Sequence, residues 1–212
     1  MRDLIMKRRS FFPLCGMAFS LLTLAACSSP DPSFYTLAPI RGTPVPGGPK
    51  LVELRRPGIA GYLDRSEIVR SNSPYQLKLN SIERWGEPFG DMLGRVLAED
   101  LNSRLSGTSV FTSAGAISAD AGARVEIDVQ RFDADAGGQI VLVAQVAITR
   151  DRNRSEPSTS SIRITETPSS ASTADYVAAM SRALAAASDR IAEDIRRSNG
   201  GLAIYPPSAG RS

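Results

Sequence analysis

An apolar segment near the amino terminus decides which part of this chain can fold. Residues 11–26 read FFPLCGMAFSLLTLAA and follow a short basic segment that contains Lys7, Arg8 and Arg9. A membrane-spanning helix needs about 20 apolar residues, so these 16 are too few, and Pro13 lies among them. A buried core helix would be amphipathic, whereas this segment is apolar on all sides. A basic start, a short apolar run and small residues at its end predict a signal peptide that is removed before folding.

The apolar segment ends in Leu24-Ala25-Ala26-Cys27, which resembles the lipobox of bacterial lipoproteins. In such signals the cysteine thiol receives a diacylglycerol group, a peptidase cleaves before it, and the new amino terminus is acylated. The resemblance therefore implies lipidation at Cys27, with palmitate as a suitable label, and more than one acyl chain gives stable anchoring. Ser28 stands where an aspartate favours the inner membrane, so we expect the outer membrane. The alternative is that Cys27 is only a small apolar residue at the end of the run.

Cleavage before Cys27 changes the charge of the chain. The whole sequence contains 25 Lys and Arg and 22 Asp and Glu, and its pI is about 9.1. Residues 1–26 hold four of the basic residues and one of the acidic residues, which leaves 21 of each and a formal charge of zero. A neutral mature chain argues against a nucleic-acid partner. Because Cys15 leaves with the signal and Cys27 is lipidated, no thiol remains for disulfide, metal or redox chemistry.

The mature chain is long enough for a single domain with its own core. Residues 27–33 comprise the lipidated cysteine and a proline-rich tether, which at about 3.5 Å per residue reaches roughly 20 Å. The folded domain is expected over residues 34–200, and a flexible tail over residues 201–212, where no periodicity is present. The short tether predicts that the domain lies close to the membrane.

Alternation of apolar and polar residues predicts strands. The expected strands are residues 33–38, 50–55, 67–71, 75–80, 124–132, 139–149 and 161–166. Asn72, Ser73 and Pro74 predict a hairpin turn, and the strand after it is expected to continue toward Trp85. Residues 133–138 predict a second hairpin turn, and the proline and glycine of residues 41–49 predict a loop.

Apolar residues spaced by three and four predict two amphipathic helices, at residues 88–105 and 173–197. Pro88 suits the first turn of the first helix, and Gly107 is placed to end it. The second helix has an apolar stripe of six residues: Val177, Met180, Leu184, Ala187, Ile191 and Ile195. Its alanines favour close packing on a sheet. The order strands, helix, strands, helix predicts an α+β fold, a single domain with a mixed or antiparallel sheet and both helices packed on one face.

The sequence contains no histidine. This excludes Ser-His and Cys-His nucleophile pairs, H-E-x-x-H metal sites and the commonest general base at neutral pH. We expect neither a metal nor a cofactor, and no catalytic residues. The nearest candidates for a carboxylate hydrolase are the pairs Glu126/Asp128 and Asp133/Asp135. Their alternating strand or turn positions favour solvated surface acids, so a hydrolase is only an alternative.

Several motifs occur in a characteristic order after the lipobox. They are FYTL at residues 34–37, YLDRSEIV at residues 62–69, and RW at residues 84–85 followed by EPFGDMLGRVLAEDL at residues 87–101. Together they resemble the ABC-type transport auxiliary lipoprotein family, the PqiC-like lipoproteins that accompany MCE-domain lipid transporters. The resemblance covers nearly the whole mature chain. Ser66 departs from the pattern, because proline is common there.

The resemblance implies a periplasm-facing, non-catalytic lipoprotein held in the membrane by its lipid anchor. It would dock on an MCE-domain protein, help to move phospholipid or other apolar cargo between membranes, and support envelope integrity. Because members of the family can form rings, homo-oligomerisation stays open. The alternative function is that of a structural or assembly lipoprotein of an outer-membrane or cell-wall machine.

The partner-facing surface is predicted around the YLDR segment. The predicted residues are Tyr62, Leu63, Asp64, Arg65 and Trp85. An aromatic residue and an arginine beside a strand end suit an interface hot spot. For Trp85 the alternative, packing in the core at the junction of strand and helix, is the favoured interpretation.

Overall fold

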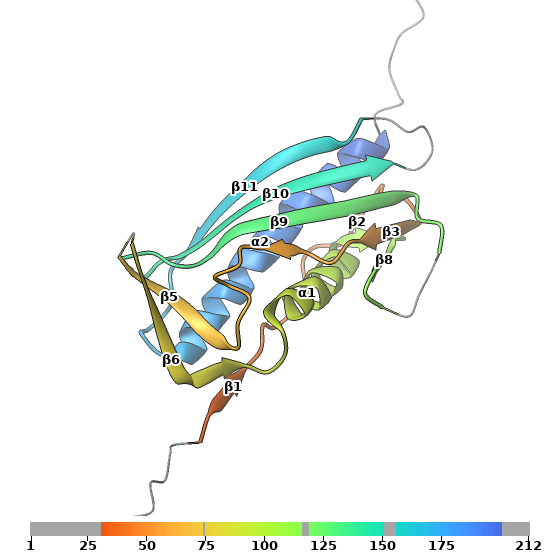
Figure 1. Ribbon diagram of the computed structural model, residues 1–212. Helices are drawn as coiled ribbons and strands as arrows, with labels where there is room; N and C mark the ends of the chain where they lie inside the picture. Colours follow the sequence, from red (N-terminus) through yellow and green to blue (C-terminus); the bar gives the residue numbers. More distant parts are fainter. Residues whose placement is uncertain (1–30, 74, 116–118, 151–155, 201–212) are drawn as a thin grey trace, which may run out of the picture. The chain divides into compact units, whose positions relative to one another are not determined.

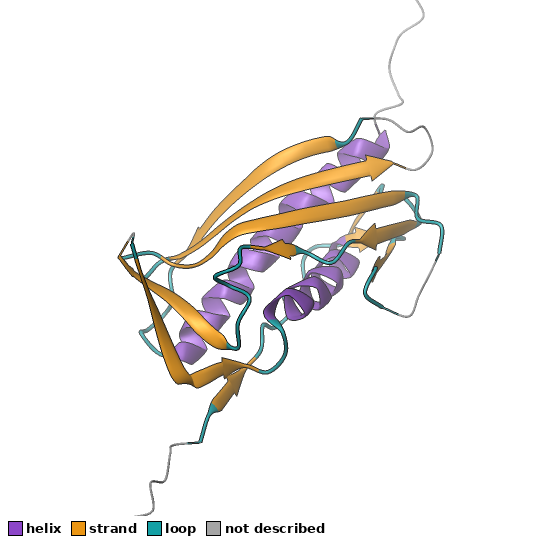
Figure 2. Ribbon diagram, in the orientation of Figure 1, coloured by secondary structure: helices purple, strands orange, loops and turns teal. Residues whose placement is uncertain are grey.

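In the residues that the structure describes, the seven predicted strands and two predicted helices occur in the predicted order, together with four short strands that the sequence pattern did not indicate. The computed structural model describes residues 31–73, 75–115, 119–150 and 156–200 (Figure 1). These residues form β1 (Ser33–Tyr35), β2 (Val45–Pro46), β3 (Leu51–Leu54), β4 (Gly58–Ile59), β5 (Glu67–Ser73), β6 (Gln76–Trp85), α1 (Phe89–Arg104), β7 (Leu105–Ser106), β8 (Ser109–Thr112), β9 (Ala123–Ala134), β10 (Ile140–Arg150), β11 (Ser158–Glu166) and α2 (Thr173–Gly200). The α+β fold class is confirmed (Figure 2).

The largest sheet has the strand order β11-β10-β9-β3-β8, with β4 beside β9. β9, β10 and β11 pair antiparallel, whereas β3 runs parallel to both β8 and β9. The sheet is therefore mixed, as predicted. The predicted hairpin turn between β9 and β10 is present, but it begins two residues later in the sequence than expected. Its Asp135 N–H donates to the Gln139 carbonyl at 2.8 Å. Gly138 has a φ of 80° there, a conformation that glycine adopts without strain.

The two helices of the described chain cover one face of this sheet and leave the other exposed. On β9, Val125, Ile127 and Val129 are buried, whereas the residues between them are exposed. α2 packs on β10 and β11 and against α1. All six residues of the predicted apolar stripe of α2 are buried. The Ser172 hydroxyl accepts the Asp175 N–H at 3.1 Å and caps the amino terminus of α2.

The first helix has boundaries close to those predicted. Pro88 directly precedes α1, and its carbonyl accepts the N–H of Asp91 at 3.0 Å and of Met92 at 3.1 Å. The helix ends at Arg104, one residue earlier than expected, and the chain continues directly into β7. Gly107 does not follow the helix immediately. Its φ of 78° lies in the turn between β7 and β8, which brings β8 back beside α1.

A second sheet has the order β1-β6-β5. β5 and β6 form the predicted hairpin, and β6 reaches Trp85 as expected. β1 runs parallel to the end of β6, with Ser33 opposite Glu83 and Tyr35 opposite Trp85. It is shorter than predicted, because after Tyr35 the chain leaves the sheet. A third, two-stranded sheet joins β2 to β7, so the predicted loop at residues 41–49 contains a short strand.

An aromatic cluster connects the second sheet to α1 and β9. Trp85 and Phe89 stack with ring centroids 5.1 Å apart, and the rings of Phe89 and Phe132 are tilted with centroids 6.0 Å apart. Such pairs stabilise a fold beyond the apolar area that they bury. Neither helix in the described parts of the chain combines the length and apolar character needed to cross a bilayer.

Candidate functional site

Residues 36–42, here called the N-terminal segment, connect β1 to both helices. The Leu37 N–H donates to the Met92 sulfur at 3.2 Å, and the Ala38 N–H donates to the Ser181 hydroxyl at 3.1 Å. The Ile40 N–H donates to the Asp100 carboxylate at 2.7 Å. These backbone donors have left the sheet, and side chains of α1 and α2 supply the acceptors that they need. The segment that follows the predicted tether is therefore fixed to the helix pair.

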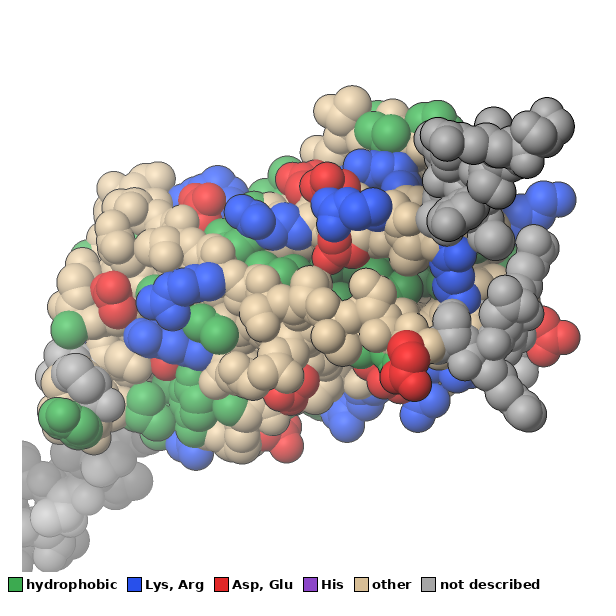
Figure 3. Space-filling view, turned by 90° about the horizontal axis from the view of Figure 1, so that it is seen from above, with side chains coloured by type: hydrophobic (Ala, Val, Ile, Leu, Met, Phe, Trp, Pro, Cys, Tyr) green, Lys and Arg blue, Asp and Glu red, His purple; other side chains and the backbone are tan. Residues whose placement is uncertain are grey.

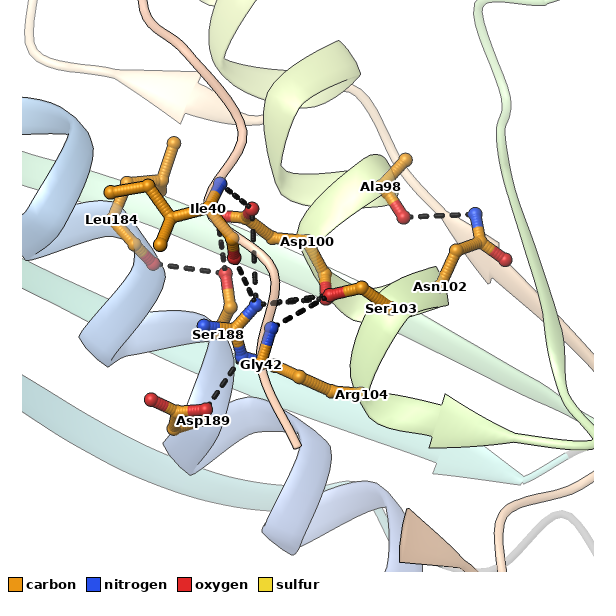
Figure 4. A network of polar contacts seen from close by, with 10 residues as sticks. All are labelled: Ile40, Gly42, Ala98, Asp100, Asn102, Ser103, Arg104, Leu184, Ser188 and Asp189. Atoms are coloured by element: carbon orange, nitrogen blue, oxygen red, sulfur yellow. Dashed lines mark hydrogen bonds and ion pairs between the residues drawn. The ribbon is translucent and has the colours of Figure 1, made fainter. Parts of the chain in front are cut away.

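A polar network holds the end of this segment (Figure 4). Asp100 and Arg104 are both buried on α1. The Arg104 guanidinium donates to Asp189 on α2 at 2.6 Å and to the Ile40 carbonyl at 2.8 Å, and it lies 3.8 Å from the Asp100 carboxylate. The Ser188 hydroxyl lies 3.4 Å from the other oxygen of Asp100. Two buried charges are thus paired and hydrogen-bonded, the condition under which burial is tolerated.

Gly42 allows the segment to approach Arg104 closely. A Cβ atom at this position would lie 2.5 Å from Cγ of Arg104, which is closer than real Cβ contacts. The Gly42 N–H donates to the Ser103 hydroxyl at 3.1 Å. With a larger side chain here, either the segment or Arg104 would have to move, so the glycine allows the close packing.

The buried carboxyl of Asp100 gives this network a dependence on pH. Burial raises the pKa of Asp100, although the Ile40 N–H, the Arg104 guanidinium and the Ser188 hydroxyl oppose the rise. A carboxyl whose pKa is higher in the folded state binds its proton more tightly when folded. Its contribution to stability is therefore greatest at low pH and falls as pH rises.

We expect Asp100→Asn to remove this titration. Its amide oxygen still accepts the Ile40 N–H, but it carries no proton to lose. As pH rises from about 4, the ordinary pKa of an aspartate, through the higher pKa of folded Asp100, the wild type should lose stability relative to the variant. Urea midpoints for both proteins across this window measure the difference. A difference that stays constant with pH would contradict the assignment to Asp100.

The predicted partner-facing residues lie together at one corner of the domain. Leu63 follows a turn in which its N–H donates to the Ala60 carbonyl at 2.8 Å. The Trp85 N–H donates to the Ser66 carbonyl at 2.8 Å, which joins the YLDR turn to the end of β6. Asp64 is exposed on this turn. Sequence segments about 20 residues apart therefore do meet, as the predicted surface requires.

Only some of these residues are available to a partner. Asp64 and Arg65 are exposed and Tyr62 is half-buried, whereas Leu63 and Trp85 are buried in the core. Trp85 thus packs in the core, as the favoured alternative holds, and Leu63 is buried there as well. Both side chains pack in the core beneath the turn. Of the five predicted residues, Asp64, Arg65 and the exposed part of Tyr62 therefore remain for contact with a partner. That contact stays a prediction.

Tyr62 lines a cleft of about 680 Å³ between the β5–β6 hairpin and β9. Within it, Asp133 is only 2% exposed and accepts hydrogen bonds from Arg131 at 2.7 Å and from Ser71 at 3.0 Å. The expectation of a solvated acid at Asp133 is therefore wrong, because the fold pairs it inside the domain. Burial and the negative charge of Asp133 together raise the pKa of Tyr62, so its hydroxyl is neutral.

The other candidate carboxylates lie on the open face of the large sheet or in a turn. Glu126 and Asp128 are exposed on the open face of the large sheet, as the interpretation as surface acids expects. Asp135 holds the β9–β10 turn, where its carboxylate accepts the N–H groups of Gly137 at 2.9 Å and Gln139 at 3.0 Å. Among the residues that the structure describes, no group of three His, Cys, Asp or Glu is placed to hold a metal ion.

The model of the family described as the ABC-type transport auxiliary lipoprotein component matches residues 35–192. The chain belongs to this family. The match extends from the end of β1 through most of α2, so it includes the N-terminal segment, the YLDR turn and the polar network. A comparison with curated proteins found no match. The resemblance inferred from the motifs is confirmed.

Solved structures share the fold of this chain. The protein XCC0632 from Xanthomonas campestris is 18% identical, with a TM-score of 0.66 over 81% of this chain and 99% of its own. A second, uncharacterized protein is 17% identical, with a TM-score of 0.65 over 78% of this chain and 99% of its own. Membership of the family implies an auxiliary, envelope-anchored lipoprotein of an ABC-type transport system, a role that favours a non-catalytic protein. Cys27 lies outside the described residues, so its lipidation stays a prediction.

Proposed function

We propose that this protein is a non-catalytic accessory subunit of an MCE-type ABC transport system, anchored in the outer membrane through lipidated Cys27 and facing the periplasm. It would help to pass phospholipid or other apolar cargo between the membranes. The family match over residues 35–192 carries this proposal. The lipobox before Cys27 supports the lipid anchor, and membership of the family supports the link to an ABC-type transport system.

The attachment of the N-terminal segment suits such a role. Force on the lipid anchor reaches the domain through β1 and then through residues 36–42, which are hydrogen-bonded to both helices. A chain end held only by a terminal strand could peel away, whereas this one is also fixed at Asp100 and Arg104. The domain can therefore stay attached to its anchor under load, and the tether keeps a bound partner within roughly 20 Å of the membrane.

The exposed part of the YLDR turn is the proposed contact with the MCE-domain protein. Asp64 and Arg65 lie over the buried side chains of Leu63 and Trp85, which give the turn a rigid base. Arg56 lies close by, within the electrostatic influence of Asp64. Charges of both signs at a rigid surface favour specific orientation of a partner.

A photo-crosslinking residue in place of Arg65 tests this proposal in intact cells. We expect a crosslink to an MCE-domain protein, and none from the matched control at Thr159, which is exposed on β11. Deletion of the protein should also raise sensitivity to detergent. Crosslinks to an outer-membrane barrel or a cell-wall synthase would instead favour the assembly role. A crosslink between copies would assign the turn to homo-oligomerisation and contradict the proposed contact.

A further inference from the structure

The strand β6 carries apolar side chains that the fold leaves uncovered. The exposed fractions are 97% for Tyr75 at its start, 43% for Leu77, 42% for Leu79 and 37% for Ile82, and Phe34 on the neighbouring β1 is 65% exposed. In Figure 3 hydrophobic side chains gather at the left end of the view, where Figure 1 places the tip of the β5–β6 hairpin. A row of exposed apolar residues along one strand marks an interaction surface.

The chain itself limits how far this surface lies from the membrane. Phe34 pairs with Arg84, so β1 begins beside the end of β6. At about 3.5 Å per residue, the residues between Cys27 and Ser33 span roughly 20 Å at most. If Cys27 is lipidated, as the proposed function holds, the bilayer must lie within that distance of the end of β6. A membrane is therefore within reach of the end of β6, and at about 3.3 Å per residue Leu79 and Leu77 lie about 13 and 20 Å farther along the same strand.

The charges on the strand agree with a lipid surface. Lys78 is exposed and Arg84 is half-buried, whereas no acidic residue occurs between Gln76 and Ile82. The one acid on β6, Glu83, accepts a hydrogen bond from Thr173 at the start of α2. Lys78 points to the opposite face of the strand from Leu77 and Leu79, so one membrane can meet all three only along the open edge of β6. Cations at that edge favour a surface of anionic headgroups.

We propose that β6 lies on the membrane that carries the lipid anchor, with its exposed apolar side chains in the interfacial region and Lys78 and Arg84 at the headgroups. In the described sheet, β1 pairs only with Glu83, Arg84 and Trp85, so Gln76–Ile82 has no strand partner on that side. Side chains bond two of its backbone groups, since the Ile82 N–H donates to Asn80 and the Ser81 carbonyl accepts from Arg84. Unpaired N–H and carbonyl groups need water, which keeps the backbone at headgroup level. Tyr75 suits this depth, because its ring is apolar and its hydroxyl is polar.

Single thiols report the position of this strand in the full-length, lipidated protein. Lipidation consumes Cys27 and Cys15 is removed, so Leu79→Cys supplies the free thiol for an NBD fluorophore. The labelled protein is reconstituted into phosphatidylethanolamine and phosphatidylglycerol liposomes with and without headgroup spin-labelled lipid. We expect quenching by the spin label, and labelling by an impermeant maleimide about tenfold slower than at the control Thr159→Cys.

The outcomes separate this inference from the proposed anchor. Protein that floats with the liposomes but is quenched equally little at both positions would overturn the contact of β6 and leave the anchor intact. Slow labelling at Leu79→Cys without quenching would mean that protein covers the strand, which also overturns the inference. Protein that does not float would overturn both proposals. Leu77→Cys repeats the test if Leu79→Cys lowers the thermal midpoint.

Discussion

Replacing Cys27 by serine is expected to abolish membrane attachment of the mature protein. A serine hydroxyl does not replace the thiol that accepts the diacylglycerol group, and cleavage before Cys27 depends on that modification. Each buried CH2 group contributes about 0.8 kcal/mol to membrane binding, so losing all acyl chains removes the whole anchor. The variant should accumulate as unprocessed precursor or as soluble protein.

Fractionation and labelling with palmitate measure this effect. Cys15→Ser is the matched control, since it removes the other thiol of the signal and leaves the lipobox unchanged. We expect normal labelling and normal mature mass for Cys15→Ser, and no labelling for Cys27→Ser. Palmitate in the Cys27→Ser protein, or a wild-type polypeptide that begins at another residue, would remove the basis of the proposed anchor.

Arg104→Met is expected to destabilise the domain strongly, because Arg104 is buried. It retains the apolar volume of the side chain but removes the hydrogen bonds to Asp189 and to the Ile40 carbonyl. It also leaves the buried carboxylate of Asp100 without its cation. Breaking one side of a buried pair costs about 3–5 kcal/mol, because the remaining charge is uncompensated.

Urea unfolding of Arg104→Met and Arg197→Met compares the loss of a buried arginine with the loss of an exposed one. Arg197 pairs with Glu193 at 2.7 Å and with Asp194 at 2.9 Å, but its side chain is 66% exposed on α2. Exposed pairs contribute little, so we expect a much smaller effect from this control. Equal losses in the two variants would mean that the network around Asp100 does not stabilise the fold. Because the charge of Arg104 opposes the rise in the pKa of Asp100, Arg104→Met should also make stability depend more strongly on pH, and adding Asp100→Asn should remove that dependence.

Periodicity predicted the elements that bury a regular stripe. The strands β9, β10 and β11 are long enough to show alternation, and α2 is long enough to show helical spacing. These patterns therefore predicted both the elements and the faces that they bury. β2, β4 and β7 have two residues each and pair in parallel with distant segments, and no local pattern can indicate such contacts. β8 has four residues and was missed for the same reason.

The candidate site was predicted in part. The YLDR motif located the turn, but Leu63 and Trp85 could have faced either way, because an apolar residue at a strand end suits an interface as well as a core. Asp100 fell on the first predicted helix and Asp133 at the start of the predicted hairpin turn, and both are positions where an acid is ordinarily exposed. Their burial depends on Arg104 and Arg131, whose positions only the tertiary fold determines. Glycine at position 42, in the sequence RGTP, was the local sign of close packing.

The N-terminal segment also sets the order in which the domain can be completed. It emerges first when the chain is delivered from its amino terminus, yet Ser181, which receives the Ala38 N–H, follows 143 residues later. Asp100, the acceptor for Ile40, follows after 60 residues. Contacts of such long separation form late, because much chain must be ordered before they close. A chain truncated before α2 would keep Met92 and Asp100, the acceptors on α1. It would lose Ser181, the acceptor for the Ala38 N–H, so the N-terminal segment would be attached to one helix instead of two.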